Sequence, residues 1–70
     1  MYTNNMRFLR KEKKMTLGQL SLITNISKGY LCHLEIGSRK NPSNVVMDKI
    51  AIALNKSIYE VFFLDFEKNK

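Results

Sequence analysis

The sequence is poor in cysteine, histidine and proline, and these scarcities exclude several classes of protein. The single cysteine, Cys32, cannot form an internal disulfide, and with the lone His33 beside it the chain cannot build a four-ligand zinc site. No apolar run approaches the roughly 18 residues of a membrane-spanning helix, and the first ten residues lack the apolar core of a signal peptide. We therefore expect a cytoplasmic protein with a free thiol and no membrane association.

Catalytic motifs are also missing from the sequence. It shows no paired carboxylates, no Ser-His-Asp set and no glycine-rich phosphate loop, so we predict that the protein is not an enzyme and uses no cofactor. No small-molecule effector is evident. The 70 residues allow one domain, 1–70, and such short chains usually need a disulfide, a metal or a second subunit for stability. A partner subunit is the stabiliser that remains.

The net charge of +6 is concentrated in one part of the chain. Residues 1–40 contain eight Lys and Arg against Glu12 and Glu35, whereas the basic and acidic groups of residues 41–70 cancel. Scattered lysines can serve solubility alone, but a charge confined to one half of the chain favours a polyanionic partner.

The hydrophobic pattern predicts an all-α fold of five short helices, at about 5–13, 16–25, 27–37, 43–54 and 57–66. Asn5, Ser27 and Ser43 are expected caps, and Thr16-Leu-Gly-Gln19 and Ser57-Ile-Tyr-Glu60 have the spacing of capping boxes. Asn25, Gly37 and Asn55 are placed to end helices in the left-handed conformation. The side chains expected to point inward are Met6, Leu9, Leu17, Leu20, Ile23, Leu31, Leu34, Met47, Ile50, Ala51, Leu54, Ile58, Val61 and Phe62.

The stretch at about 16–36 carries the functional signal. Two helices of about eight residues are joined by a turn too short for an antiparallel pair, which is the geometry of a helix-turn-helix. The second helix of the pair would present Lys28, Gly29, Cys32 and His33 outward. Such a face suits the major groove, where Lys28 could donate to guanine and His33 could bond a purine edge.

The span from Met6 to Phe62 resembles the lambda-repressor-like, XRE-type helix-turn-helix family of Cro and phage repressors. The matching residues are Met6 to Arg10, Met15-Thr16, Leu20, Ile26-Ser27, Tyr30-Leu31, Leu34-Glu35, Gly37, Asn41-Pro42-Ser43, Lys49-Ile50-Ala51, Ala53-Leu54 and Ser57. The resemblance implies that Lys28, Gly29, Tyr30 and His33 face bases or adjacent phosphates. It also implies a structural ion pair between Arg10 and Glu35.

Phosphate contacts are expected at Thr16, Leu17, Ser27, Arg39 and Lys40. The family usually has glutamine where this chain has Leu17, so only the backbone amides at the start of that helix can bind phosphate there. Lys14 and Asn25 stand where the family prefers glycine, and asparagine fits that role better than lysine. An extra residue lengthens the loop that carries Arg39 and Lys40.

The last two predicted helices, 43–66, carry more apolar side chains than the core of so small a domain can bury. They form two stripes, and we predict that these are the interface of a homodimer: Val45, Ile52, Tyr59, Phe63 and Phe66. Folding of the tail onto its own domain is the alternative for these residues.

The predicted function is a sequence-specific, dimeric transcriptional regulator that binds an inverted-repeat operator in double-stranded DNA. A repressor is favoured over an activator because the chain has no room for an effector domain. The alternative function is a protein-interaction module, or an antitoxin-like partner, that docks through the apolar face of the last two helices.

Overall fold

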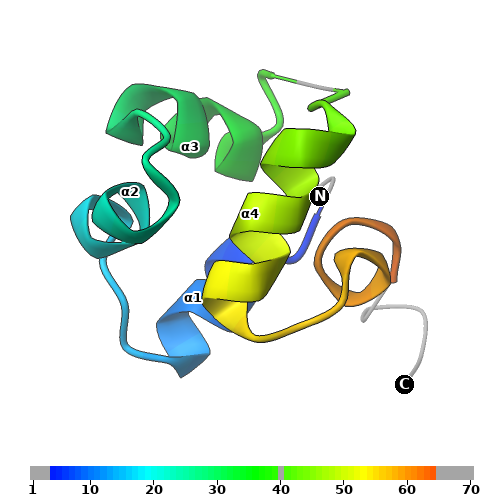
Figure 1. The fold of residues 1–70 in the computed structure, drawn as a ribbon, viewed down its shortest axis with the longest axis horizontal. Coiled ribbons are helices and arrows are strands. Elements are labelled where there is room, and N and C mark those ends of the chain that lie inside the picture. Colours follow the sequence, from blue (N-terminus) through cyan, green and yellow to red (C-terminus); the bar gives the residue numbers. More distant parts are fainter. Residues whose placement is uncertain (1–3, 40, 65–70) are drawn as a thin grey trace.

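The computed structural model describes residues 4–39 and 41–64 and shows the predicted all-α fold, with no strand among those residues. Figure 1 shows the short helices wrapped around a common centre. In chain order they are α1 (Met6–Glu12), α2 (Leu17–Thr24), α3 (Lys28–Ile36), α4 (Asn44–Leu54) and one π-helical turn, η1 (Tyr59–Phe63). No helix in the described ranges has the length and apolar character needed to cross a membrane.

The helix boundaries are set by polar caps, as the sequence predicts. The side chains of Thr16, Ser27 and Ser43 each accept a hydrogen bond from the backbone N–H three residues later. At the other ends, Asn25 and Asn55 adopt the left-handed conformation, with φ of 60° and 58°. Because only one residue is left-handed at each place, the helix ends there and the chain leaves it in a new direction.

The start of α1 differs from the prediction. Asn5 is the N-cap residue, but its side chain makes no capping hydrogen bond. It instead donates to the carbonyl oxygens of Glu60 and Leu64, at 2.9 and 2.6 Å, and the Asn5 N–H donates to Val61 O at 2.7 Å. The Met6 N–H finds its acceptor in the side chain of the preceding Asn4, at 3.0 Å. Asn5 therefore joins the two ends of the described chain.

The core consists of apolar side chains from every helix, and it confirms most of the predicted inward positions. Its buried members are Met6, Leu9, Leu20, Leu31, Leu34, Ile50, Ala51, Leu54 and Val61. Leu17, Ile58 and Phe62 pack against it and are partly buried. The prediction for Ile23 is wrong: its side chain is 60 % exposed, and Thr24 is buried in its place. Thr24 tolerates burial because its hydroxyl donates to Leu20 O at 2.8 Å and accepts from Ile26 N–H.

The last predicted helix is shorter than expected. Ser57 and Glu60 form the expected capping box, with both hydrogen bonds at 3.0 Å. The turn that follows ends at Phe63, because Leu64 is extended. Phe66, in the predicted continuation of this helix, lies outside the described residues.

Candidate nucleic-acid interface

The turn between α2 and α3 is held by side-chain hydrogen bonds. Ser21 Oγ donates to Ile26 O at 2.6 Å, and Asn25 takes the left-handed conformation that reverses the chain. Figure 1 shows α2 almost end-on while α3 runs across the view, so the two helices cross steeply. This is the predicted helix-turn-helix geometry, and it leaves one side of α3 facing away from the protein.

A buried ion pair fixes α3 to α1. Arg10 Nε and Nη2 donate to the two carboxylate oxygens of Glu35 at 2.7 and 3.1 Å, a bidentate arrangement. Arg10 Nη1 also donates to Met15 O at 2.7 Å. Arg10 and Glu35 are only 8 % and 4 % exposed. The pair predicted from the resemblance is therefore present, and Arg10 ties the loop before α2 to the same point.

The outward face of α3 consists of Lys28, Gly29 and His33, which are all exposed. Cys32 and Tyr30 are half-buried, so they contribute only part of their surface to this face. A methyl group added at Gly29 would meet no atom within 4 Å. The fold therefore does not itself require glycine at this position, although glycine is unfavourable within a helix.

The loop after α3 folds back along that face. The guanidinium of Arg39 lies 4.9 Å from the centre of the Tyr30 ring, a cation–π contact. His33 Nδ1 lies 2.8 Å from Ser38 Oγ. Arg39 is exposed, so its charge remains available to a partner. Lys40, which was expected to act beside Arg39, lies outside the described residues.

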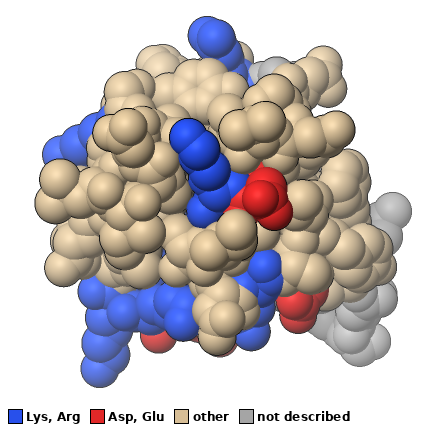
Figure 2. All heavy atoms as spheres, viewed as in Figure 1, with Lys and Arg blue, Asp and Glu red and all other residues tan. Residues whose placement is uncertain are grey.

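A basic groove runs beside the start of α2. Its volume is about 550 Å³, and it is lined by Arg7, Arg10, Lys11, Lys14, Met15, Thr16 and Leu17. Figure 2 shows Lys and Arg side chains gathered along the lower edge of the view, where α1 ends. The ion pair found in the described ranges uses Arg10, so the charges of Arg7, Lys11 and Lys14 are not neutralised by a carboxylate there. Arg7 and Lys11 are four residues apart and therefore lie on one face of α1.

The backbone at the start of α2 offers two free donors. The capping box uses the Thr16 N–H, bonded to Gln19 Oε1 at 2.8 Å, and the Gln19 N–H, bonded to Thr16 Oγ1 at 3.0 Å. The amides of Leu17 and Gly18 are the first two of the helix and have no acceptor within it. The Leu17 side chain packs against the core, so Leu17 can reach an anion only through its N–H.

The predicted dimer residues are exposed wherever the structure describes them. Val45 and Ile52 on α4 are 65 % and 70 % exposed, and Tyr59 and Phe63 on η1 are 58 % and 64 % exposed. Leu22 on α2, which no sequence pattern marked as an interface residue, is even more exposed, at 85 %. Phe66 is outside the described residues.

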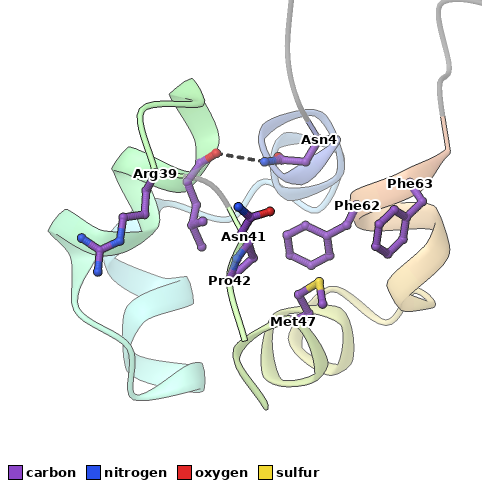
Figure 3. Close-up of a pocket in the computed structure, with 8 residues that line it drawn as sticks. Asn4, Arg39, Asn41, Pro42, Met47, Phe62 and Phe63 are labelled. Atoms are coloured by element: carbon purple, nitrogen blue, oxygen red, sulfur yellow. Dashed lines mark hydrogen bonds between the residues drawn. The ribbon is translucent and has the colours of Figure 1, made fainter. Parts of the chain in front are cut away.

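A cavity of about 400 Å³ lies between the loop after α3 and η1. Figure 3 shows Phe62, Met47 and Pro42 around it, with Asn4 bonded to the Leu34 carbonyl at 2.9 Å on one side. The Arg39 side chain, although it borders the cavity, is turned away from it. Arg39 therefore supplies its charge to the outward side of the loop.

Comparison with known proteins agrees with this geometry. Residues 6–61 match the family model described as helix-turn-helix. Over 56 residues the chain is 34 % identical to the HTH-type transcriptional regulator SlrR of Bacillus subtilis (strain 168), a match that covers 80 % of this chain and 37 % of that regulator. The crystal structure of the restriction-modification controller protein C.AhdI from Aeromonas hydrophila superposes with a TM-score of 0.75 and 30 % identity, covering 80 % of this chain and 83 % of that one. The chain therefore belongs to the helix-turn-helix family, whose members are DNA-binding transcriptional regulators and not enzymes.

Proposed function

We propose that this protein is a dimeric, sequence-specific repressor that reads the major groove of DNA with α3. The observation that carries the proposal is the outward face of α3, where Lys28, Gly29 and His33 are all exposed and a methyl group at Gly29 would meet no atom within 4 Å. Cations also lie on the loop after α3, at Arg39, and along the basic groove beside the start of α2. An α-helix of this kind fits the width of the major groove, and flanking cations fit the phosphates on its two edges.

Each residue of the face has a distinct role in the proposal. Lys28, in the first turn of α3, donates to the O6 and N7 atoms of guanine. Gly29 lets the helix backbone approach the bases closely, and Tyr30 contacts DNA through the exposed part of its half-buried ring. His33 reads a base further along the groove.

Phosphate binding is assigned to the helix starts and to the cations beside them. Ser27 and Thr16 mark the N-termini of α3 and α2, where unpaired amides and the helix dipole favour an anion. The Leu17 N–H serves the same phosphate as Thr16. Arg39 and Lys40 hold a phosphate from the loop, and Arg7, Lys11 and Lys14 add charge at the opposite edge.

Dimerisation completes the proposal. Two copies pairing through α4 and η1 would cover Val45, Ile52, Tyr59 and Phe63, with Phe66 beyond the described residues. The operator would then be an inverted repeat whose half-site centres lie about 34–36 Å apart. Repression needs only occupancy of a promoter, and a DNA ligand accords with the cytoplasmic location expected from the sequence.

The proposal is tested by selecting bound fragments from random duplex DNA and comparing two variants on the selected site. Lys28→Ala should weaken binding by about 1–3 kcal/mol and relax the preference at one base pair. Arg39→Ala should weaken binding to all sequences alike and reduce the steepness of the salt dependence by about one unit. Unchanged affinity and unchanged site preference in Lys28→Ala would show that α3 does not read the bases.

A protein-binding role is the second candidate, because the exposed apolar side chains of α4 and η1 suit a protein partner as well as a second copy. Salt dependence separates the two functions. A DNA-binding protein loses affinity with a log–log slope of about −0.9 for each phosphate that it neutralises. Weak, salt-independent binding to duplex DNA, together with poor retention on heparin, would favour the protein-binding role.

A further inference from the structure

The side chain of Arg39 runs back along α3 from the loop that follows this helix. The Arg39 backbone N–H donates to the His33 carbonyl at 3.1 Å, and the guanidinium lies 4.9 Å from the centre of the Tyr30 ring. Tyr30 is the third residue of α3 and Ile36 is the last, a separation of about 9 Å along the helix axis. The charge of Arg39 therefore lies beside the first half of α3.

The Tyr30 ring is the anchored partner in this contact. Tyr30 is half-buried and packs against the hydrophobic core, whereas Arg39 is exposed. Gly37 ends α3 in the left-handed conformation, with φ of 84°, and directs the loop back toward the helix. The core thus fixes the ring, and the ring orients the longer, exposed arginine side chain.

Arg39 keeps its full charge in this position. The ion pair found in the described ranges joins Arg10 to Glu35, so no carboxylate there neutralises Arg39. An aromatic ring attracts a cation through its π electrons and leaves the charge in place. Figure 3 shows the Arg39 side chain turned away from the cavity that it borders. A phosphate can therefore approach the guanidinium while the ring holds it.

We propose that Tyr30 is a positioning residue, which holds the guanidinium of Arg39 beside the first half of α3 so that Arg39 meets a phosphate when the helix enters the major groove. The part of this inference that concerns DNA rests on the proposed function, whereas the ring contact concerns the free protein alone. A direct contact between Tyr30 and DNA would instead use the Tyr30 hydroxyl, and Tyr30→Phe removes that group while keeping the ring.

Three substitutions separate charge, ring and hydroxyl at this contact. Arg39→Lys keeps the charge, but an ammonium is compact and strongly hydrated and lacks the planar surface with which a guanidinium stacks on a ring. Tyr30→Leu keeps an apolar side chain against the core and removes the π electrons. Tyr30→Phe keeps the ring and should therefore behave as the wild type does.

The first experiment is proton NMR of the full chain without DNA. Protons above the face of an aromatic ring are shifted upfield, so we expect upfield-shifted side-chain protons of Arg39 in the wild type and in Tyr30→Phe. In Tyr30→Leu these protons should return to the shifts of an ordinary arginine, with circular dichroism showing that the helices persist. Ordinary Arg39 shifts in the wild type would overturn the proposal, because the ring would then not hold the cation.

The second experiment measures affinity for the selected DNA site in a double-mutant cycle. With Arg39 present, Tyr30→Leu should weaken binding about two- to fivefold, the strength of an exposed cation–π contact. With Arg39→Ala already in place, the same change should cost less than about 1.5-fold. A general loss of folding would weaken binding equally in both backgrounds, so the cycle distinguishes positioning from core packing.

Two further variants test the same contact without removing a buried group. Arg39→Lys changes an exposed residue and should weaken binding although it keeps the charge. Tyr30→Phe should bind as the wild type does. A loss in Tyr30→Phe as large as that in Tyr30→Leu, or equal losses from Tyr30→Leu with and without Arg39, would refute the positioning role.

The outcomes also separate this proposal from the proposed function. If Arg39→Ala leaves the affinity unchanged, the phosphate contact of Arg39 fails as part of the proposed function. The DNA part of this inference then fails with it, while the upfield shifts still show that Tyr30 holds the cation in the free protein. If Arg39→Ala weakens binding and the effects of Tyr30→Leu and Arg39→Ala are additive, the phosphate contact stands and the positioning role fails.

Discussion

The region from α1 to α3 and the region from α4 to η1 solve different physical problems. The first is cationic, and its helices are fixed by polar contacts: the buried pair of Arg10 and Glu35, and the Ser21 bond across the turn. The second is neutral overall and places apolar side chains such as Ile52 in solvent. The polar contacts specify one orientation of α3, which a DNA-reading helix needs. The apolar surface is less directional and suits a protein partner.

The largest expected effect on the cationic region comes from removing one member of the buried ion pair between Arg10 and Glu35. Glu35→Ala should destabilise the domain by about 3–5 kcal/mol, because it leaves the Arg10 guanidinium buried without a counter-charge. Urea denaturation followed by circular dichroism measures this loss. The control is the double variant Arg10→Met with Glu35→Leu, which should recover much of the stability because it buries no charge. Equal loss in the double variant would show that packing, and not the ion pair, stabilises this region.

The apolar region is tested by charging its surface. Ile52→Asp should weaken self-association at least tenfold, because a carboxylate would be buried at the proposed interface. Leu22→Asp is the matched control, since Leu22 is even more exposed but lies on α2. Sedimentation at micromolar concentration should show that the wild type is a dimer. In thermal denaturation, its melting temperature should rise with protein concentration, because folding and pairing are linked. A wild-type monomer of 8.2 kDa, even with DNA, would remove the dimer from the proposal.

Local signals in the sequence were sufficient for most of the fold. Caps such as Thr16 and left-handed stops such as Asn25 act through neighbouring backbone atoms, so a few residues of sequence determine them. The buried pair was predicted through the resemblance, because residues 25 apart in sequence have no local signature. At the site, the exposure of Lys28 and His33 followed from helical periodicity alone.

The errors arose where tertiary contacts outweigh periodicity. Ile23 and Thr24 both suit the inner face of an eight-residue helix, and the crossing with α3 selects the one whose hydroxyl can be satisfied there. Asn5 had the sequence of a cap, but its amide found carbonyls more than fifty residues away. The contact between His33 and Ser38 depends on the direction of the loop after Gly37, which the sequence does not reveal.

A substitution at Gly29 should have opposite effects on the stability of the domain and on its affinity for DNA. Gly29→Ala should stabilise the domain by about 0.8–1 kcal/mol, because alanine favours the helix and its methyl group meets open space. The same methyl group should weaken DNA binding if the backbone approaches the bases at this point. Thermal denaturation and operator binding, measured on the same sample, give the two signs. Increased stability with unchanged affinity would show that Gly29 does not lie against DNA.

The smallest expected effect concerns the capping box that begins the last turn. Hydrogen bonds from the backbone and the side chain of Ser57, with the nearby Lys56, hold the pKa of Glu60 below its ordinary value of 4.5. The stabilisation is therefore fully present above pH 4.5 and is lost as the pH falls through the lowered pKa. A carbon-13 NMR titration should give a Glu60 midpoint below 4.5, and the stability of Glu60→Gln should lack this part of the pH dependence. A midpoint at or above 4.5 would contradict the bonded carboxylate.

The hydrogen bonds of Asn5 link the apolar surface of η1 to the helices that carry the cationic surface. Asn5 holds η1 through the carbonyls of Glu60 and Leu64, and α1 continues from Asn5 to Arg10, which grips α3 through Glu35. Chain ends usually fray independently, but here hydrogen bonds join the start of α1 to the last described turn. The hydrogen bonds of Asn5 and the ion pair of Arg10 thus connect η1 to α3 through the single helix α1.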